Sequence, residues 1–435
     1  MNLKSNLFIS LFAGLLFTLP VFSQNILFSD TVSDKPIPTG VIFHFETHRQ
    51  LHVKGGDGHG DNFCQTWAAD GNIYTYCDDG YGWVPRNSRA GMSGFSCRLW
   101  RITGDVNSRD VNELPNQPVY PFPNKWYGFG IVSVEGTLYG TVTHVGGPGG
   151  GWDRPFNGFK LMYSPDSGTS WYLHDGRKLE PGETSGLSRS INPEDNFIWH
   201  EDPTTITDRR GVDKTGFAFT SVYPVQCGQD NNMAKDDYIY WYAPDVPANR
   251  LNLARVHKNH IKDRSQWEFF KEWNNTNPVW TADIEKRGAA IDFPQHYKEW
   301  VAAWRGNKPS VVYNPGLDKY IMINWIEYKS AYWDLPRLHE EMGVKSYAMG
   351  LYYSDRPYGP WTEFYWEFDF KPGGRDYSIY HPQLSPKWIA DDGKTMHMIF
   401  TSRSSFGIVG KAEDYAWPDQ IDYAWNEMKL TIITE

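Results

Sequence analysis

Short segments in which hydrophobic and polar residues alternate recur along the chain, and no long stretch has a helical period. Alternation with a period of two is typical of a β-strand with one buried face. Five such segments each follow a turn signal, which indicates hairpins. The segments are residues 72–76, 137–142, 238–242, 319–325 and 395–400, and their turns are residues 70–71, 135–136, 236–237, 315–316 and 392–393.

A second alternating segment follows most of these hairpins, at residues 97–102, 159–163, 251–256 and 349–353. Several of these segments run into a turn that ends in Trp. Residues 164–171 match the Asp-box pattern S-x-D-x-G-x-x-W, which resembles the hairpin turn of sialidase-like propellers and is a folding element. Strand pairs at intervals of several tens of residues therefore predict repeated four-stranded units.

The predicted fold is all-β, a single five-bladed β-propeller of four-stranded antiparallel blades. A length of 435 residues would otherwise suggest about three domains at roughly 150 residues each. Residues 428–434 are the expected late strand of the fifth blade, and residues 41–45 are expected to complete a blade and close the ring. A two-sheet sandwich is the alternative architecture.

Composition narrows the class of protein. Trp 20, Tyr 26 and Phe 24 make 16% of the chain, and this apolar surface argues against a disordered protein. The formal net charge of −10 gives no support for a nucleic-acid partner, which would require a basic surface. A hydrophobic content of 40% with a negative mean hydropathy excludes a polytopic membrane protein.

The first residues predict export. Lys4 precedes an apolar run at residues 7–22, and the small residue Ser23 follows it. This is the layout of a cleaved signal peptide over residues 1–23, with an uncleaved membrane anchor as the alternative. We therefore expect residues 24–435 to form one propeller domain that is periplasmic or secreted, monomeric and not inserted in the membrane.

The cysteines leave two interpretations open. Cys64, Cys77, Cys97 and Cys227 could form two disulfides in an oxidising compartment, in any of three connectivities, or could be free buried thiols. Their spacing fits no zinc signature.

A Gly-rich polar segment at residues 55–62 holds the densest group of candidate functional residues. In an extended backbone Asp57, His59 and Asp61 point to one side. The hairpin at residues 70–71 returns the chain to the same end, where Asp79 follows Asp78. Asp61 and Asp79 can therefore face one cleft, as the two carboxyl groups of a glycoside hydrolase do.

Other candidates for substrate binding lie near Asp61 or at the ends of predicted inner strands. His144 runs into a Gly-rich segment that ends at Trp152 and lacks the Lys of a phosphate-binding loop. The full set of substrate-binding candidates is Asp57, His59, Trp67, Asp78, His144, Trp152, His200, Tyr223, Arg375 and His381.

Two groups of residues carry a family resemblance. Residues 61–62, 66–68, 70–71, 74 and 79–80, and near the other end residues 380–388 and 391–394, resemble signatures of a large family of secreted bacterial propeller proteins. That family is mostly uncharacterised and includes endo-D-arabinanases. The resemblance implies that Asp61 and Asp79 are the acid and the base, without saying which is which. Asp78 departs from the pattern by adding a carboxylate.

Three functions remain open at this point. The first is a glycoside hydrolase with Asp61 and Asp79. The second is a lyase or dehydratase that eliminates at a uronic acid, with a base among His59, His144, His200, Tyr223 and His381 and with Arg375 to neutralise the carboxylate. The third is a glycan-binding propeller without catalysis. No cofactor is expected, and a divalent cation at Asp57, His59 and Asp61 is the alternative.

Overall fold

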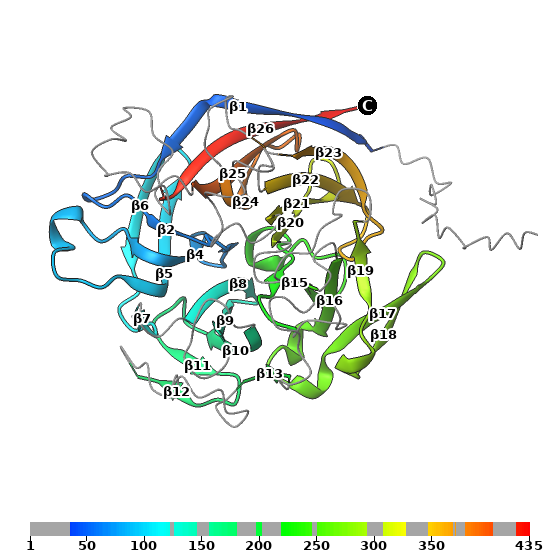
Figure 1. Ribbon diagram of the computed structural model, residues 1–435, viewed down its shortest axis with the longest axis horizontal. Coiled ribbons are helices and arrows are strands. Elements are labelled where there is room, and N and C mark those ends of the chain that lie inside the picture. The colour runs from blue at the N-terminus through cyan, green and yellow to red at the C-terminus, as the bar shows by residue number, and fades with distance from the viewer. Residues whose placement is uncertain are drawn as a thin grey trace, which may run out of the picture. The chain divides into compact units, whose positions relative to one another are not determined.

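The computed structural model describes residues 35–121, 126–145, 156–180, 197–201, 219–245, 250–293, 308–327, 347–368, 370, 379–402 and 423–435. All of them fall in one unit, Ser33–Glu435, and the predicted signal peptide lies outside them. They form five antiparallel sheets round a common centre, which confirms the five-bladed β-propeller (Figure 1). None of the helices in these ranges is long and apolar enough to cross a membrane.

Blades 1 to 3 contain additional short strands beside a central four. Blade 1 comprises β2 (His59–Asp61), β3 (Gln65–Trp67), β4 (Ile73–Gly82), β5 (Phe95–Asp105), β6 (Ser108–Glu113) and β7 (Tyr120–Pro121). Blade 2 comprises β8 (Trp126–Val134), β9 (Thr137–Val145), β10 (Phe156–Ser164), β11 (Trp171–Leu173), β12 (Lys178–Leu179) and β13 (Trp199–His200). Blade 3 comprises β14 (Tyr223–Pro224), β15 (Tyr238–Pro244), β16 (Arg250–His257), β17 (Glu268–Asn274), β18 (Asn277–Thr281) and β19 (Ala289–Asp292).

Blades 4 and 5 have four strands each. Blade 4 comprises β20 (Lys308–Asn314), β21 (Lys319–Glu327), β22 (Tyr347–Ser354) and β23 (Thr362–Phe368). Blade 5 comprises β24 (Ile379–Ile389), β25 (Thr395–Ser402), β26 (Asn426–Thr434) and the N-terminal strand β1 (Pro38–Gln50). The pairing of β1 with β26 confirms that an N-terminal strand closes the ring.

The predicted turns are confirmed in four blades, where they join β3 to β4, β8 to β9, β20 to β21 and β24 to β25. Blade 3 differs, because the chain between β14 and β15 passes through the short helix Gln229–Asn231, so residues 236–237 do not form a tight hairpin turn. The Asp box also folds as expected. Gly168 N–H donates to Ser164 Oγ at 2.8 Å, Ser170 N–H donates to Asp166 Oδ1 at 2.8 Å, and Trp171 is buried.

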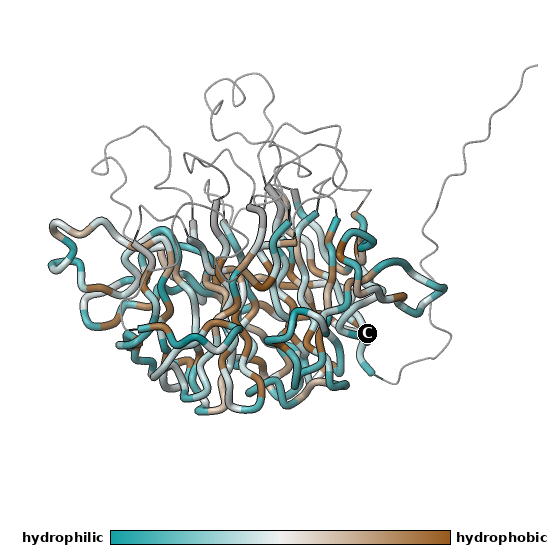
Figure 2. Tube along the Cα trace, turned by 90° about the horizontal axis from the view of Figure 1, so that it is seen from below, coloured by the Kyte–Doolittle hydropathy of each residue, from teal (hydrophilic) through white to brown (hydrophobic). Residues whose placement is uncertain are grey.

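Hydrophobic side chains between neighbouring blades hold the ring together. Each of the five hydrophobic clusters found among the described residues joins two adjacent blades. Between blades 5 and 1, the ring of Trp425 lies 5.1 Å from Phe63 and 5.6 Å from Trp83. Figure 2 shows apolar residues along the interior of the fold. Much of the aromatic content therefore serves packing between blades.

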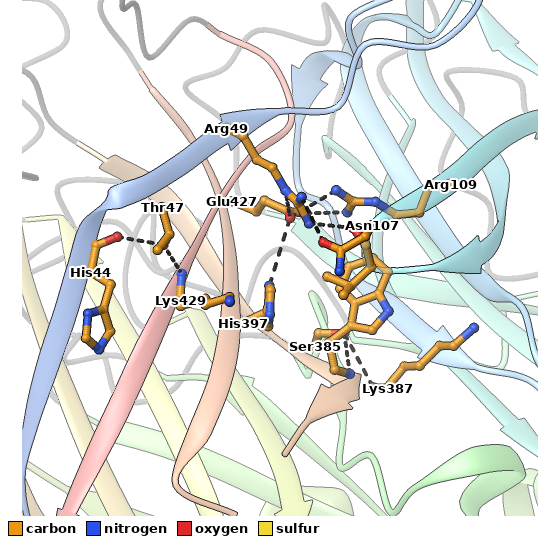
Figure 3. Close-up of polar contacts among 12 residues, drawn as sticks. His44, Thr47, Arg49, Asn107, Arg109, Ser385, Lys387, His397, Glu427 and Lys429 are labelled. Carbon is orange, nitrogen blue, oxygen red and sulfur yellow. Dashed lines mark hydrogen bonds and ion pairs between the residues drawn. The ribbon is translucent and has the colours of Figure 1, made fainter.

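A buried ion-pair network fastens blade 5 to blade 1 (Figure 3). Glu427 in β26 is 1% exposed and accepts from Arg49 Nε of β1 at 2.6 Å. It also pairs with Arg109 of β6, which belongs to blade 1. His397 Nδ1 lies 3.9 Å from the same carboxylate. Burial lowers the pKa of His397 to about 4 despite the nearby Glu427 charge, so this contact is not an ion pair at neutral pH.

The network predicts loss of stability in acid. His397 carries its proton in the unfolded chain below about pH 6.5 but in the folded protein only below about pH 4. The folded state is therefore favoured above pH 6.5, and this contribution of about 3 kcal/mol disappears between pH 6.5 and 4. Burial raises the pKa of Glu427, but the arginines lower it overall, so its contribution is lost at lower pH still. Urea unfolding at pH 7 and pH 4 measures the difference, which should be smaller in His397→Gln; an equal difference in both proteins would contradict the assignment.

Candidate active site

The inner strands of the five blades meet round the propeller axis, and side chains near their first residues face one space. Phe129 of β8 lies among them, with its ring 5.9 Å from Tyr223 of β14 and 6.3 Å from His381 of β24. Lys308 Nζ of β20 lies 5.3 Å from the same ring. Burial raises the pKa of Tyr223, and the charge of Asp61 in β2 adds to the shift. All five blades therefore contribute to this space.

The backbone at this level is unusual in three blades. Asn62, Ser221 and His381 have φ values of 51°, 49° and 49°, in the left-handed region that residues other than glycine rarely adopt. The pairing of β24 with β25 shifts register between Tyr380 and Gln383, which identifies a β-bulge at His381. Strained residues and bulges gather at functional sites because they redirect side chains that a regular strand would point elsewhere.

The three residues with left-handed backbone also bring buried polar atoms without partners to the site. Asn62 Oδ1, Ser221 Oγ and both ring nitrogens of His381 lack a hydrogen-bond partner within the described part of the chain. The residues are 4%, 2% and 1% exposed, respectively. Buried polar groups normally have partners, so such a set indicates a binding site. It mixes donors with acceptors, which suits a ligand that both donates and accepts, such as a hydroxyl group.

Three carboxyl groups lie at the blade 1 side of this space. Asp61 is directly opposite Asp78 in the pairing of β2 with β4. Asp61 is 5% exposed, and its Oδ2 accepts a hydrogen bond of 2.7 Å from the hydroxyl of Tyr423. Asp79 is partly exposed and has a φ of 49°, so its side chain departs from the regular alternation of β4. The candidate pair Asp61 and Asp79 thus lies at one rim.

The phenols of Tyr127 and Tyr423 lie close to the carboxyl groups of the site. Burial raises the pKa of Tyr127 well above its usual value, and the charges of Asp79 and Asp61 raise it further. The pKa of Tyr423 is raised in the same way by burial and then by Asp61 and Asp79. Both phenols therefore stay protonated near neutral pH and act as hydrogen-bond donors.

Of the other predicted binding residues, some lie at the site and others lie away from it. His59 belongs to the site, since its ring lies 5.5 Å from Tyr423, and burial lowers the pKa of this imidazole. Asp57 is 4% exposed and its carboxylate pairs with Arg86 and Arg89, so we assign it a structural role.

Trp67 and His200 lie apart from the carboxylates. Trp67 pairs with Ile73 next to the first hairpin turn and packs between blades 5 and 1. His200 of β13 packs against Phe197 at 5.5 Å in blade 2. The backbone of His144 pairs with Trp126, while Trp152 and Arg375 lie outside the described residues.

Residues in and beside the inner strands also line a narrow cavity. Its lining includes Gln65, Tyr223, Ser310 and Gln383, one from each of four blades. The cavity has room for about one water molecule. Phe129, Ile131 and Leu384 add apolar side chains to the same lining, so the cavity is mixed in character.

Metal ligands are not grouped in the described ranges. They contain no set of three His, Cys, Asp or Glu side chains arranged to hold an ion. Asp57, His59 and Asp61, the alternative cation site, are instead engaged with arginines, tyrosine rings and the Tyr423 hydroxyl, respectively.

All four cysteines are free and buried, which decides between the two interpretations of the sequence. Burial raises the pKa of each thiol. A thiol reacts as the thiolate, so these groups are inert in the folded protein.

We therefore expect an aromatic disulfide reagent that reports free thiols to react with none of the cysteines in the native protein. The denatured, unreduced protein should give four thiols per chain. Rapid reaction of the native protein, or fewer thiols after denaturation, would contradict the assignment.

Several residues of the site were not singled out from the sequence. They are Asn62, Tyr127, Phe129, Lys308, Tyr380 and Tyr423. Most of them lie within the first few residues of an inner strand. A search of the first residues of each predicted inner strand would therefore have found them. Tyr423 could not have been found in this way, because it precedes β26, which is not an inner strand. Its hydroxyl contacts Asp61 only because the ring closes between blades 5 and 1.

Comparisons with known proteins give no family assignment. No family model matches the chain, and no curated protein matches it. Among solved structures, a proposed hydrolase from Bacteroides ovatus ATCC 8483 is 14% identical, with 88% of this chain and 87% of that chain covered and a TM-score of 0.45. The catalytic domain of a Coprinopsis cinerea GH62 α-L-arabinofuranosidase is 10% identical, with coverages of 91% and 98% and a TM-score of 0.41.

A third solved structure, the Bacillus subtilis arabinanase Arb43A, is 10% identical, with coverages of 86% and 96% and a TM-score of 0.39. Likenesses this low do not identify a reaction or a substrate for this chain. The resemblance to the family that includes endo-D-arabinanases stays a prediction.

Proposed function

We propose that this protein is an exported glycoside hydrolase that cleaves a polysaccharide or oligosaccharide, with Asp61 and Asp79 as its acid–base pair. The observation that carries the proposal is that two carboxylates border a buried space lined by polar atoms without partners. Glycoside hydrolysis needs one carboxyl group to protonate the leaving oxygen and a second to activate water or attack the sugar.

The hydrogen bond from Tyr423 favours different roles for the two residues. An O–H donor 2.7 Å from Asp61 stabilises the ionised carboxylate of that residue. Asp61 is therefore assigned as the base, which takes a proton from the attacking water. Asp79 is partly exposed and is assigned as the acid, which gives its proton to the departing oxygen.

Recognition of a sugar is supported by the lining of the site. Sugar hydroxyls both donate and accept, as Asn62, Ser221 and His381 require. The partly exposed rings of His59 and Tyr81, 5.4 Å apart, add an aromatic surface beside the carboxylates. Aromatic faces offer apolar contact with one end left to solvent, which suits the mixed surface of a carbohydrate.

Elimination at a uronic acid is less well supported by the same site. It requires a deprotonated phenol or imidazole. Tyr127, Tyr223 and Tyr423 have pKa values raised well above the usual range by burial and, to a lesser extent, by neighbouring aspartates, so the base would be an imidazole such as His59, whose pKa burial lowers. Tyr380 differs, since its hydroxyl lies 3.5 Å from Lys308 Nζ. For this reason the test of function must distinguish elimination from hydrolysis.

A panel of plant, mycobacterial and algal polysaccharides tests the proposal. The purified protein should release new reducing ends from at least one of them, without the near-ultraviolet absorbance of an unsaturated uronate. If this absorbance rises together with the number of reducing ends, the reaction is elimination and not hydrolysis. If the protein binds a glycan but forms no product from it, the protein is a glycan-binding propeller without catalysis.

A further inference from the structure

Asp78 is the carboxyl group of the site that no substrate can reach. It is 0% exposed and lies in β4 between the two proposed reacting residues. Its Oδ2 accepts from Asn62 Nδ2 at 3.0 Å and from Gly128 N–H at 2.8 Å. The first bond holds the residue whose left-handed backbone follows Asp61, and the second ties blade 1 to the residue after Tyr127. Asp78 thus contacts the parts of two blades that aim site residues.

The surroundings of Asp78 are poor in compensation for a negative charge. The titratable groups that face it are Asp61 from β2, the thiols of Cys64, Cys77 and Cys97, and the phenols of Tyr127 and Tyr223; the Cys97 thiol is hydrogen-bonded to it. Burial raises the pKa of Asp78 well above its usual value, and the Asp61 charge raises it further, against the hydrogen bonds it accepts. A second charge directly opposite Asp61 would be strongly unfavourable in this buried position.

We propose that Asp78 is the positioning residue of the site: a neutral carboxylic acid that fixes Asn62 and Gly128 without adding a third negative charge beside Asp61 and Asp79. Its contribution to turnover rests on the proposed function, whereas its protonation at neutral pH does not. The acidic proton remains on Asp78 throughout the reaction, so the residue neither gives nor takes a proton from the substrate.

Asp78→Asn is the informative variant, because an amide is also neutral and its oxygen can accept both hydrogen bonds. The infrared difference spectrum between wild type and Asp78→Asn at pH 7 should show the loss of a carboxylic-acid carbonyl band. Loss of an ionised-carboxylate band would overturn the proposal. This measurement needs no substrate.

Activity supplies a second readout. Asp78→Asn should keep turnover within about threefold at neutral pH and keep it to higher pH than wild type, which loses activity as Asp78 ionises. Asp78→Leu removes the oxygen that accepts both hydrogen bonds and should lower the thermal midpoint of unfolding relative to Asp78→Asn. If Asp61→Asn and Asp79→Asn abolish turnover and folded Asp78→Asn does too, the proposed function stands and the positioning role fails. If those two variants keep full turnover, the proposed function fails while the infrared band still decides protonation.

Discussion

Asp61→Asn is expected to lower turnover of the glycan substrate by about 100- to 10,000-fold, the range that a general acid or base contributes. Asparagine is isosteric but cannot take a proton from water, and the Tyr423 hydroxyl can still donate to its amide oxygen. Asp79→Asn is expected to lose activity in the same range, because an amide cannot protonate the leaving oxygen. Initial rates of reducing-end release measure both effects.

A matched control is available in the same blade. Asp110 of β6 forms a surface pair of 2.7 Å with Lys54 and is about half exposed in its side chain, so Asp110→Asn should leave turnover unchanged. The thermal midpoints of all three variants should show that they are folded. Full activity in folded Asp61→Asn or Asp79→Asn would show that the acid–base pair has been assigned wrongly.

The second large effect concerns the closure of the ring. Glu427→Gln removes the negative charge from a network in which Arg109 is only 4% exposed in its side chain. An unpaired buried charge is costly, so the free energy of unfolding should fall by about 3–5 kcal/mol. Tyr423 precedes β26, which carries Glu427, so loosening of this junction should also weaken the Tyr423–Asp61 bond at elevated temperature.

Glu113→Gln is the control for this variant. Glu113 pairs with Arg98 but is 53% exposed in its side chain, so its loss should cost no more than about 1 kcal/mol. Urea unfolding followed by tryptophan fluorescence measures both variants. Equal, small losses for Glu427→Gln and Glu113→Gln would mean that the network does not hold blade 5 to blade 1.

Local sequence patterns predicted the blades because the strands and turns of each blade are formed by residues that are close together in the sequence. The Asp box shows this, since Ser164, Asp166 and Gly168 satisfy one another within a single turn. Blade 3 was predicted less well, because its inner strand β14 has only two residues and is followed by a short helix. Alternation cannot be recognised over so short a strand.

The site was predicted only in part, for a related physical reason. Asp61 and Asp79 belong to one hairpin, and hairpin geometry places them at one rim without further information. The partner of Asp61, by contrast, is Tyr423, which is 362 positions away and is brought near only when the ring closes. The sequence likewise shows Asp78 only as a further acidic residue and does not predict that it is completely buried.

Cleavage in water enriched in heavy oxygen tests the central claim most directly. Hydrolysis adds one oxygen atom from water to each new reducing end, whereas elimination adds none. The account predicts that mass spectrometry finds one heavy oxygen at each new reducing end formed by the wild-type protein, none in the fragment that keeps the glycosidic oxygen, and no labelled product with Asp61→Asn. Unsaturated products without the label, or labelled products formed at the wild-type rate by Asp61→Asn, would contradict it.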